Sequence, residues 1–375
     1  MKTKQPGNGS IKVHHGREDD GRRFAVVVMG ASAGGIDALS KVVRSLDPEL
    51  PAAVLIVLHT SAYSALPTIL GRASYLKVEH ARDGQVLGPG QVLIAPPDRH
   101  LVLHDAHVVL SRGPKQNNMR PAIDPLFKSA ARVYGPQVIA VILSGTLDDG
   151  SAGLVAVEHA GGVCIVQSPR DAAYPEMPSN ALAAVKADHV LPAEAIGQKL
   201  NELLAHTKVA PMKKSNRQRQ STRTAEPDKI DPEAIPKGEV STLTCPECGG
   251  TLWERREGNL LRFVCHTGHE FAAGSLADAQ NNGVENALWV ALRTLKERAM
   301  FVSRMAAEAG RNGRHHTQVR YKAEERELKE RARLIQKVLV DAPSVAGTAI
   351  NQASQPRGKR ARNSRNKPKH AKTSR

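Results

Sequence analysis

The sequence lacks the long apolar runs and the many cysteines that mark membrane proteins and disulfide-stabilised proteins. No apolar run reaches the ~20 residues that a membrane-spanning helix needs. Residues 1–23 are polar and charged and contain no apolar core of a secretory signal. The 375 residues include 4 cysteines, and three of these fall in one cluster, which does not suit a disulfide framework. We therefore expect a soluble, cytoplasmic protein of two or three domains with no membrane span.

Acidic residues are missing from two stretches that carry much of the net charge of +16. The stretch 213–223 holds five Lys and Arg residues and the stretch 357–375 holds nine, with no Asp or Glu in either. Because both are polar and show no apolar periodicity, we predict a basic disordered linker at 206–240 and a basic disordered tail at 341–375. Such stretches can serve solubility, or they can contact a polyanion without sequence preference.

One apolar run ends in glycines and a serine. Residues 24–29 have the composition of a buried parallel strand, and a helical pattern begins at Ile36. Between them, Gly30-Ala31-Ser32-Ala33-Gly34 fits the G-x-S-x-G form of a nucleophile elbow. A sharp turn would place the Ser32 hydroxyl at a helix N-terminus, where free N–H groups favour an anion. Glycine-rich turns also bind phosphate, so this motif alone leaves a nucleophile and an anion-binding loop as alternatives.

Two further polar side chains follow predicted strands. His59 comes at the end of the apolar run 52–58, and Asp149 follows the run 138–143. Such strands separated by helical patterns predict a doubly wound, mostly parallel α/β sheet, whose strand ends share one edge. Ser32, His59 and Asp149 can therefore meet there as nucleophile, base and orienting acid. Their order along the chain differs from the Ser, Asp, His order of α/β-hydrolases.

Six motifs in order give residues 24–205 a family resemblance. They are Val28–Gly35, the strand that ends in His59, Ile94–His100, Met119–Asp124, Leu143–Gly150 and Glu176–Pro178. Together they resemble the catalytic domain of bacterial chemotaxis receptor methylesterases (CheB-type). The resemblance implies a doubly wound α/β fold and a Ser-His-Asp triad that needs no cofactor. It also implies hydrolysis of glutamate γ-methyl esters on chemoreceptors with release of methanol, and often deamidation of receptor glutamines.

By position, the resemblance assigns Ser32 as the nucleophile, His59 as the general base and Asp149 as the orienting acid. Asp149 fits better than Asp148, because the triad acid of the family directly precedes the glycine, here Gly150. Several neighbours depart from the usual pattern, and substrate preference is therefore open. These are Ala33, Leu58, Thr146 and Leu147, where the family often has threonine, glutamine, methionine and glycine.

The 23 residues before the first predicted strand leave no room for the receiver domain that regulates many of these enzymes. We therefore expect an esterase that is either constitutively open or controlled by its own C-terminal part.

A second group of residues with binding chemistry lies towards the C-terminus. Cys245 and Cys248 form a C-x-x-C knuckle, and Cys265 and His269 follow after a gap of 16 residues. Two tight turns at this separation predict a zinc-ribbon-like module at 241–275, because tetrahedral Zn²⁺ takes two ligands from each turn. His269 suits the fourth position better than the histidine that adjoins Cys265. We expect a structural zinc rather than a catalytic one, because no further acid accompanies the cluster.

Two amphipathic helical patterns follow the ribbon. One apolar face combines Leu288, Leu292, Leu295, Ala299 and Val302, the other combines Leu328, Ala332, Ile335 and Leu339, and Gly310–Gly313 supplies the turn. The patterns predict a helical hairpin over 284–340. It can pack on itself, on the ribbon or on a second copy, or it can dock a protein partner. Ribbon and hairpin together support the alternative function, a catalytically weak scaffold or regulatory binding protein.

These predictions divide the chain into segments with different roles. They are a disordered N-terminus (1–23), a methylesterase domain (24–205) with an antiparallel hairpin between 91–96 and 100–111, the basic linker (206–240), the ribbon (241–275), the helical hairpin (284–340) and the basic tail (341–375).

Overall fold

The computed structural model describes residues 24–59, 65–205 and 238–341. Almost all of the predicted linker and both predicted disordered termini lie outside these ranges. The chain divides into two units, residues 1–281 and residues 282–375. Within the described ranges, no helix combines the length and the apolar composition that crossing a bilayer requires.

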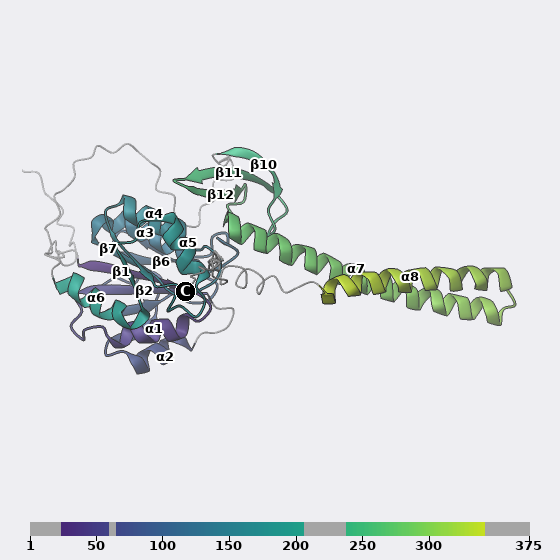
Figure 1. The fold of residues 1–375 in the computed structure, drawn as a ribbon, viewed down its shortest axis with the longest axis horizontal. Coiled ribbons are helices and arrows are strands. Elements are labelled where there is room, and N and C mark those ends of the chain that lie inside the picture. The colour runs from purple at the N-terminus through teal and green to yellow at the C-terminus, as the bar shows by residue number, and fades with distance from the viewer. Residues whose placement is uncertain (1–23, 60–64, 206–237, 342–375) are drawn as a thin grey trace, which may run out of the picture. The chain divides into compact units, whose positions relative to one another are not determined.

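A seven-stranded parallel sheet forms the centre of the first unit (Figure 1). Its strands lie in the order β3-β4-β2-β1-β7-β8-β9, and every neighbouring pair is parallel. They are β1 (Ala25–Ala31), β2 (Ala52–Leu58), β3 (Lys77–His80), β4 (Gln91–Ile94), β7 (Val138–Ile142), β8 (Val163–Gln167) and β9 (His189–Leu191). The strand order reverses between β1 and β7, which is where such sheets open a crevice at their carboxyl edge.

Helices cover both faces of this sheet because its strands are apolar on both sides. In β1, Val26 and Val28 face one core, whereas Val27 and Met29 face the other. The first core packs against α3 (Ile123–Tyr134), α4 (Ser151–His159) and α5 (Glu176–Ala184), and the second against α1 (Gly35–Arg44), α2 (Leu66–Ala73) and α6 (Ala193–Ala205). A short 3-10 turn, η1 (Gly135–Gln137), leads into β7. The predicted doubly wound α/β fold class is confirmed.

The antiparallel hairpin is present, but it is built from other strands than expected. β5 (His100–His104) pairs with β6 (His107–Ser111), and the turn between them is at 105–106 rather than at 96–99. Residues 91–94 instead join the parallel sheet as β4, between β2 and β3. The three apolar residues of β4 are buried, which suits a sheet covered on both faces. Asp105 takes a left-handed φ of 52° in the turn, a conformation that Asp tolerates.

The ribbon is a four-stranded antiparallel sheet that belongs to the first unit. Its strands lie in chain order as β10 (Glu239–Thr244), β11 (Thr251–Glu257), β12 (Leu260–Cys265) and β13 (Glu270–Ala272). β11 and β12 are its central strands, and β10 and β13 extend the sheet at its edges. Three large apolar side chains, Leu252, Phe263 and Phe271, fill its small core beside two of the cysteines.

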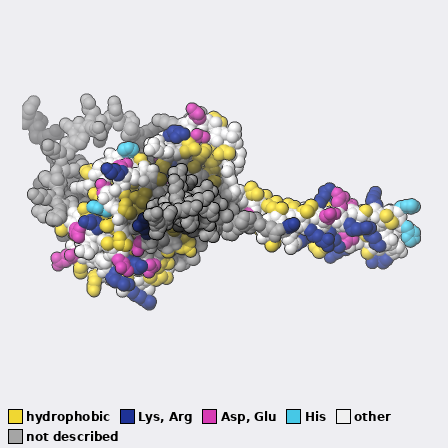
Figure 2. All heavy atoms as spheres, in the orientation of Figure 1, with side chains coloured by type: hydrophobic (Ala, Val, Ile, Leu, Met, Phe, Trp, Pro, Cys, Tyr) yellow, Lys and Arg dark blue, Asp and Glu magenta, His cyan; other side chains and the backbone are white. Residues whose placement is uncertain are grey.

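The helical hairpin consists of α7 (Ala273–Arg311) and α8 (His315–Asp341). The start of α7 belongs to the first unit, and the helix beyond residue 281 belongs with α8 to the second unit. α7 begins at Ala273 rather than near 284, because β13 leads directly into it. Gly313 makes the turn with a φ of 69°. Ala299, Val302 and Leu328 form the buried seam between the helices. Lys, Arg, Asp and Glu side chains are mixed along the exposed surface of the hairpin (Figure 2).

Candidate active site

Ser32 lies in the tight turn between β1 and α1. Gly34 precedes α1 with a φ of 71°, and a Cβ at this position would lie 2.8 Å from Ser144 Oγ. A Cβ on Gly30 would lie 2.5 Å from the side chain of Ile123. Both positions therefore require glycine, which is the physical reason for the glycines on either side of Ser32.

Ser144, just after β7, holds this turn in place. Its carbonyl oxygen accepts the N–H of Ser32 at 2.9 Å. Its hydroxyl donates to the carbonyl oxygen of Ala33 at 2.8 Å and accepts the N–H of Tyr174 at 2.9 Å. The neighbouring strand thus fixes the backbone on both sides of the Ser32 side chain.

His59 follows β2 and contacts the acid expected to orient it. His59 Nε2 lies 2.7 Å from Asp149 Oδ2, and the two side chains are 6% and 2% exposed. The His59 N–H donates to the carbonyl oxygen of Ala31, next to Ser32, at 3.1 Å. Ser32 and His59 line the same open hollow at the edge of the sheet. The contact with Asp149 uses Nε2 of the His59 ring, so Nδ1 is on the side of the ring away from this carboxylate.

Asp149 lies at the N-terminus of α3, where backbone N–H groups converge on its carboxylate. It accepts the N–H of Ile123 at 2.6 Å and of Asp124 at 3.2 Å, and Asn117 Nδ2 donates to it at 2.8 Å. Burial by itself raises the pKa of Asp149, but the hydrogen bonds from His59, Ile123 and Asn117 outweigh burial and hold this pKa below its ordinary value. Asp149 is therefore an anion at neutral pH, as an acid that orients a histidine must be.

Asp124 makes the reciprocal contact at the N-terminus of α4. Its Oδ1 accepts the N–H groups of Gly150 at 3.1 Å and of Gly153 at 2.7 Å. Asn117 Nδ2 also donates to Asp124 Oδ2 at 3.1 Å, so one amide bridges the two buried carboxylates. The sequence pattern assigned no role to Asn117 or Asp124. The one signal for Asp124 was its place in a family motif.

Asp148, next to Asp149, has different partners. Its carboxylate accepts the N–H of Gly274 at 3.0 Å and the hydroxyl of Ser275 at 2.5 Å, at the start of α7. It therefore caps that helix. Leu147 precedes it with a left-handed φ of 62°. This conformation costs a non-glycine residue about 1–2 kcal/mol, a cost that glycine would not carry.

The residues that hold this site match known proteins. The profile of the CheB methylesterase family matches residues 27–200. A putative protein-glutamate methylesterase/protein-glutamine glutaminase of Leptospira interrogans is 35% identical over 178 residues, which are 47% of this chain and 92% of that protein. This chain belongs to the CheB methylesterase family. The family resemblance drawn from the six motifs is thereby confirmed.

Two further CheB relatives show how the match is distributed. The protein-glutamate methylesterase/protein-glutamine glutaminase 2 of Anaeromyxobacter dehalogenans is 42% identical over 183 residues, 48% of this chain and 54% of that protein. The chain thus spans about half the length of this relative. The crystal structure of the Thermotoga maritima CheB methylesterase catalytic domain is 36% identical, with a TM-score of 0.47, and the match covers 48% of this chain and 99% of that domain. The ribbon and the helical hairpin lie outside the residues matched by the CheB profile.

The four predicted metal ligands converge in the ribbon beyond the CheB domain. Their ligand atoms all lie within 4.8 Å of one another, and they come from Cys245, Cys248, Cys265 and His269. Cys248 Sγ lies 3.7 Å from Cys265 Sγ, which lies 3.4 Å from His269 Nδ1. The edges of a tetrahedral site with Zn–S and Zn–N bonds of about 2.3 and 2.0 Å measure about 3.5–3.8 Å, so these two separations and the set of four ligand types suit Zn²⁺. His266 lies beside the Trp253 ring instead, with centroids 6.4 Å apart.

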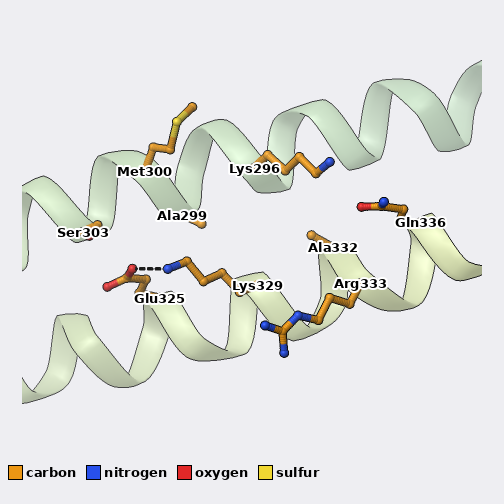
Figure 3. Close-up of a pocket in the computed structure, with 9 residues that line it drawn as sticks. All are labelled: Lys296, Ala299, Met300, Ser303, Glu325, Lys329, Ala332, Arg333 and Gln336. Carbon is orange, nitrogen blue, oxygen red and sulfur yellow. Dashed lines mark hydrogen bonds and ion pairs between the residues drawn. The ribbon is translucent and has the colours of Figure 1, made fainter.

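A separate hollow lies between α7 and α8 in the second unit (Figure 3). The short side chains of Ala299 and Ala332 leave space between the helices, and Lys329 Nζ pairs with Glu325 at 2.6 Å beside them. The other lining residues are Lys296, Met300, Ser303, Arg333 and Gln336. These nine residues include no histidine, no cysteine and a single acid, so the hollow offers no catalytic arrangement. The partner of the hairpin stays a prediction.

Proposed function

We propose that this chain is a protein-glutamate methylesterase with Ser32, His59 and Asp149 as its triad. The observation that carries the proposal is the buried contact of 2.7 Å between His59 and Asp149, beside a serine turn that lines the same hollow. Membership of the CheB family supports ester hydrolysis as the reaction class. The names of the relatives support glutamyl methyl esters and glutamine side chains of proteins as substrates. Methylated chemoreceptors are the substrates that fit this chemistry.

In the first half of the proposed reaction, Ser32 Oγ attacks the ester carbonyl while His59 takes the hydroxyl proton on Nδ1. The bond between the carbonyl carbon and the methoxy oxygen then breaks, and His59 returns the proton to that oxygen. Methanol leaves, and the glutamyl group stays as an ester on Ser32. Water repeats the sequence on this acyl-enzyme and releases the glutamate carboxyl group. With a glutamine substrate the leaving group is ammonia.

The charge on the tetrahedral intermediate needs N–H donors close to Ser32. The N–H of Ser32 donates to Ser144 O, and the N–H of Gly35 donates to Ser32 O, so both are engaged within the fold. The N–H groups of Ala33 and Gly34 precede α1, where helical N–H groups have no intrahelical acceptor. We assign these two groups as the oxyanion donors.

The cysteine cluster has a structural part in this proposal. Cys245, Cys248, Cys265 and His269 would hold one Zn²⁺, which supplies a crosslink between the two knuckles when it is bound. Ester hydrolysis at Ser32 requires no step at this metal.

Methanol release from methylated chemoreceptor cytoplasmic fragments tests the proposal. We expect Ser32→Ala to lower kcat by about 10⁶-fold and Asp149→Asn by about 10⁴-fold, the usual costs of losing a triad serine and a triad acid. Ser179→Ala is the matched control for the serine, because Ser179 is exposed on α5 and its hydroxyl donates to the carbonyl oxygen of Pro175, one turn earlier. Asp105→Asn is the control for the acid, because Asp105 is 85% exposed in the β5–β6 turn.

Both controls should keep wild-type rates. A wild-type chain that releases methanol no faster than the Ser32→Ala variant would show that the esterase proposal is wrong and would favour the scaffold alternative.

A further inference from the structure

Arg262 is a buried cation in strand β12 of the ribbon. Its side chain is 0% exposed. Nε and Nη2 donate to Glu270 Oε1 at 3.1 and 2.9 Å, whereas Nη1 lies 3.1 Å from Asp124 Oδ2. Glu270 belongs to the ribbon, but Asp124 belongs to the CheB domain. The planar guanidinium therefore spans two carboxylates from two parts of the chain.

Asp124 connects Arg262 to the triad acid through backbone and side chain. Asp124 Oδ1 accepts the N–H of Gly150, the residue that follows Asp149. In return, Asp149 accepts the N–H of Asp124. A shift of Asp124 would therefore move the backbone on which Asp149 stands as well as one of the donors that orient its carboxylate.

The ribbon also fixes the orientation of Asn117, the amide between the two carboxylates. The N–H of Asn117 donates to Glu270 O at 2.7 Å, and the N–H of Ala272 donates to Asn117 Oδ1 at 2.8 Å. Asn117 is 1% exposed. Because Oδ1 of Asn117 accepts from the ribbon, Nδ2 faces Asp124 and Asp149 and donates to both carboxylates.

Arg262 further balances the charge behind the triad. Asp124 and Asp149 are both buried, and burial together with the charge of Asp149 raises the pKa of Asp124. The cations that face Asp124 are Arg262 and Lys128. Of these, Arg262 makes the direct contact. A buried carboxylate that loses its cation is strongly disfavoured and must move, take up water or take up a proton.

We propose that Arg262 is a positioning residue of the catalytic triad, so that the ribbon forms part of the esterase's active unit. Arg262 touches no reacting atom, and it acts through Asp124 and Asn117 on Asp149. The inference rests on the proposed function of Ser32, His59 and Asp149. It gives the ribbon a role in hydrolysis that its metal cluster does not supply.

The test compares full-length Arg262→Met with full-length Arg256→Met. Arg256 lies opposite residue 261 in the same ribbon sheet but is exposed, so the control makes the same chemical change away from Asp124. We expect Arg262→Met to lower kcat for methanol release about 10- to 100-fold, because displacement of a catalytic group by about 1 Å costs up to about 10²-fold. KM should change less than about twofold, because Arg262 does not line the hollow at Ser32. Wild-type kcat in Arg262→Met would overturn the inference.

Arg262→Lys separates positioning from folding. Lysine keeps the positive charge but cannot span Asp124 and Glu270 as the guanidinium does. We expect a folded protein, judged by circular dichroism, with kcat between those of wild type and Arg262→Met and an unchanged KM. Where Arg262→Met does not fold, a kcat of Arg262→Lys within about twofold of wild type overturns the inference.

Labelling of Ser32 by a fluorophosphonate probe, read by intact mass, removes the dependence on a receptor substrate. Slower labelling of Arg262→Met than of Arg256→Met, by about tenfold or more, supports the inference even if receptor fragments release no methanol. Equal labelling of the two variants overturns it and leaves the proposed function in place. A wild-type chain that neither releases methanol nor labels at Ser32 removes both.

Discussion

Replacement of Gly34 by alanine tests how tightly the serine turn is built. Gly34 has a φ of 71°, and a Cβ there would lie 2.8 Å from Ser144 Oγ and 3.0 Å from Ala173 Cβ. Gly84 offers a matched control. It has a φ of 72°, and a Cβ there would meet no described atom within 4 Å. The two alanine variants thus share the backbone penalty and differ in the contact with Ser144.

The expected magnitudes follow from these contacts. The left-handed conformation costs an alanine about 1–2 kcal/mol, and this should be the whole effect of Gly84→Ala. In Gly34→Ala the Ser144 hydroxyl must also move, which weakens its hydrogen bonds to Ala33 and Tyr174. Each bond contributes about 1 kcal/mol, so Gly34→Ala should destabilise the fold by about 2 kcal/mol more than the control. It should also lower kcat about 10- to 100-fold, because it displaces the proposed oxyanion donors.

Urea unfolding followed by far-UV circular dichroism measures the difference in the free energy of unfolding between the two variants, and methanol release measures kcat. Both single variants are made in the same full chain, so the contribution of the other segments to the free energy of unfolding cancels in the comparison. Equal destabilisation by Gly34→Ala and Gly84→Ala, with equal kcat, would refute the argument that Ser144 limits this turn.

Two further predictions concern the metal cluster and the triad acid. The chain should contain about one zinc per molecule by elemental analysis. The Cys265→Ser variant should lose this zinc and have a lower Tm, whereas the His266→Ala variant should retain the zinc. Full zinc content in Cys265→Ser would contradict the assignment of the ligands. The pKa of Asp149 in the folded state lies below the ordinary value of about 3.9. Ionised Asp149 therefore stabilises the fold above about pH 3.9, and this stabilisation is lost as the pH falls through the lower pKa of the folded state. Asp149→Asn should therefore flatten the decline of the free energy of unfolding below about pH 4, while Asp105→Asn leaves it steep; equal slopes would contradict the pKa argument.

The contact between Arg262 and Asp124 predicts that the ribbon supports hydrolysis at Ser32 rather than inhibiting it. A ribbon that only covered the hollow at Ser32 would inhibit, and its removal would activate the esterase. Arg262 instead reaches the carboxylates behind His59, so its removal leaves Asp124 without its direct cation. A chain truncated at residue 210 should on this view hydrolyse more slowly than the full chain.

Much of the CheB part could be predicted from local pattern. Apolar runs such as 52–58 indicate buried parallel strands because only a sheet covered on both faces hides every side chain. The prediction of the antiparallel hairpin was wrong about which strands form it, because the apolar residues of 91–94 fit a parallel strand as well as an antiparallel one. The domain bounds and the triad roles stay predictions. The structure places His59 against Asp149 and places Ser32 and His59 at one hollow.

The sequence by itself determined the family, the fold class, the candidate triad and the four candidate metal ligands. Each of these depends on residue types at fixed spacing, which local chain geometry converts into strands, turns and knuckles. Only the tertiary structure decided that Arg262 lies against Asp124 and that Asn117 joins Asp124 to Asp149. Arg262 and Asp124 are more than a hundred positions apart, and Asn117 joins the start of α3 to the segment after β7. A charged residue within an apolar strand does not reveal its partner until burial forces the charge to find one.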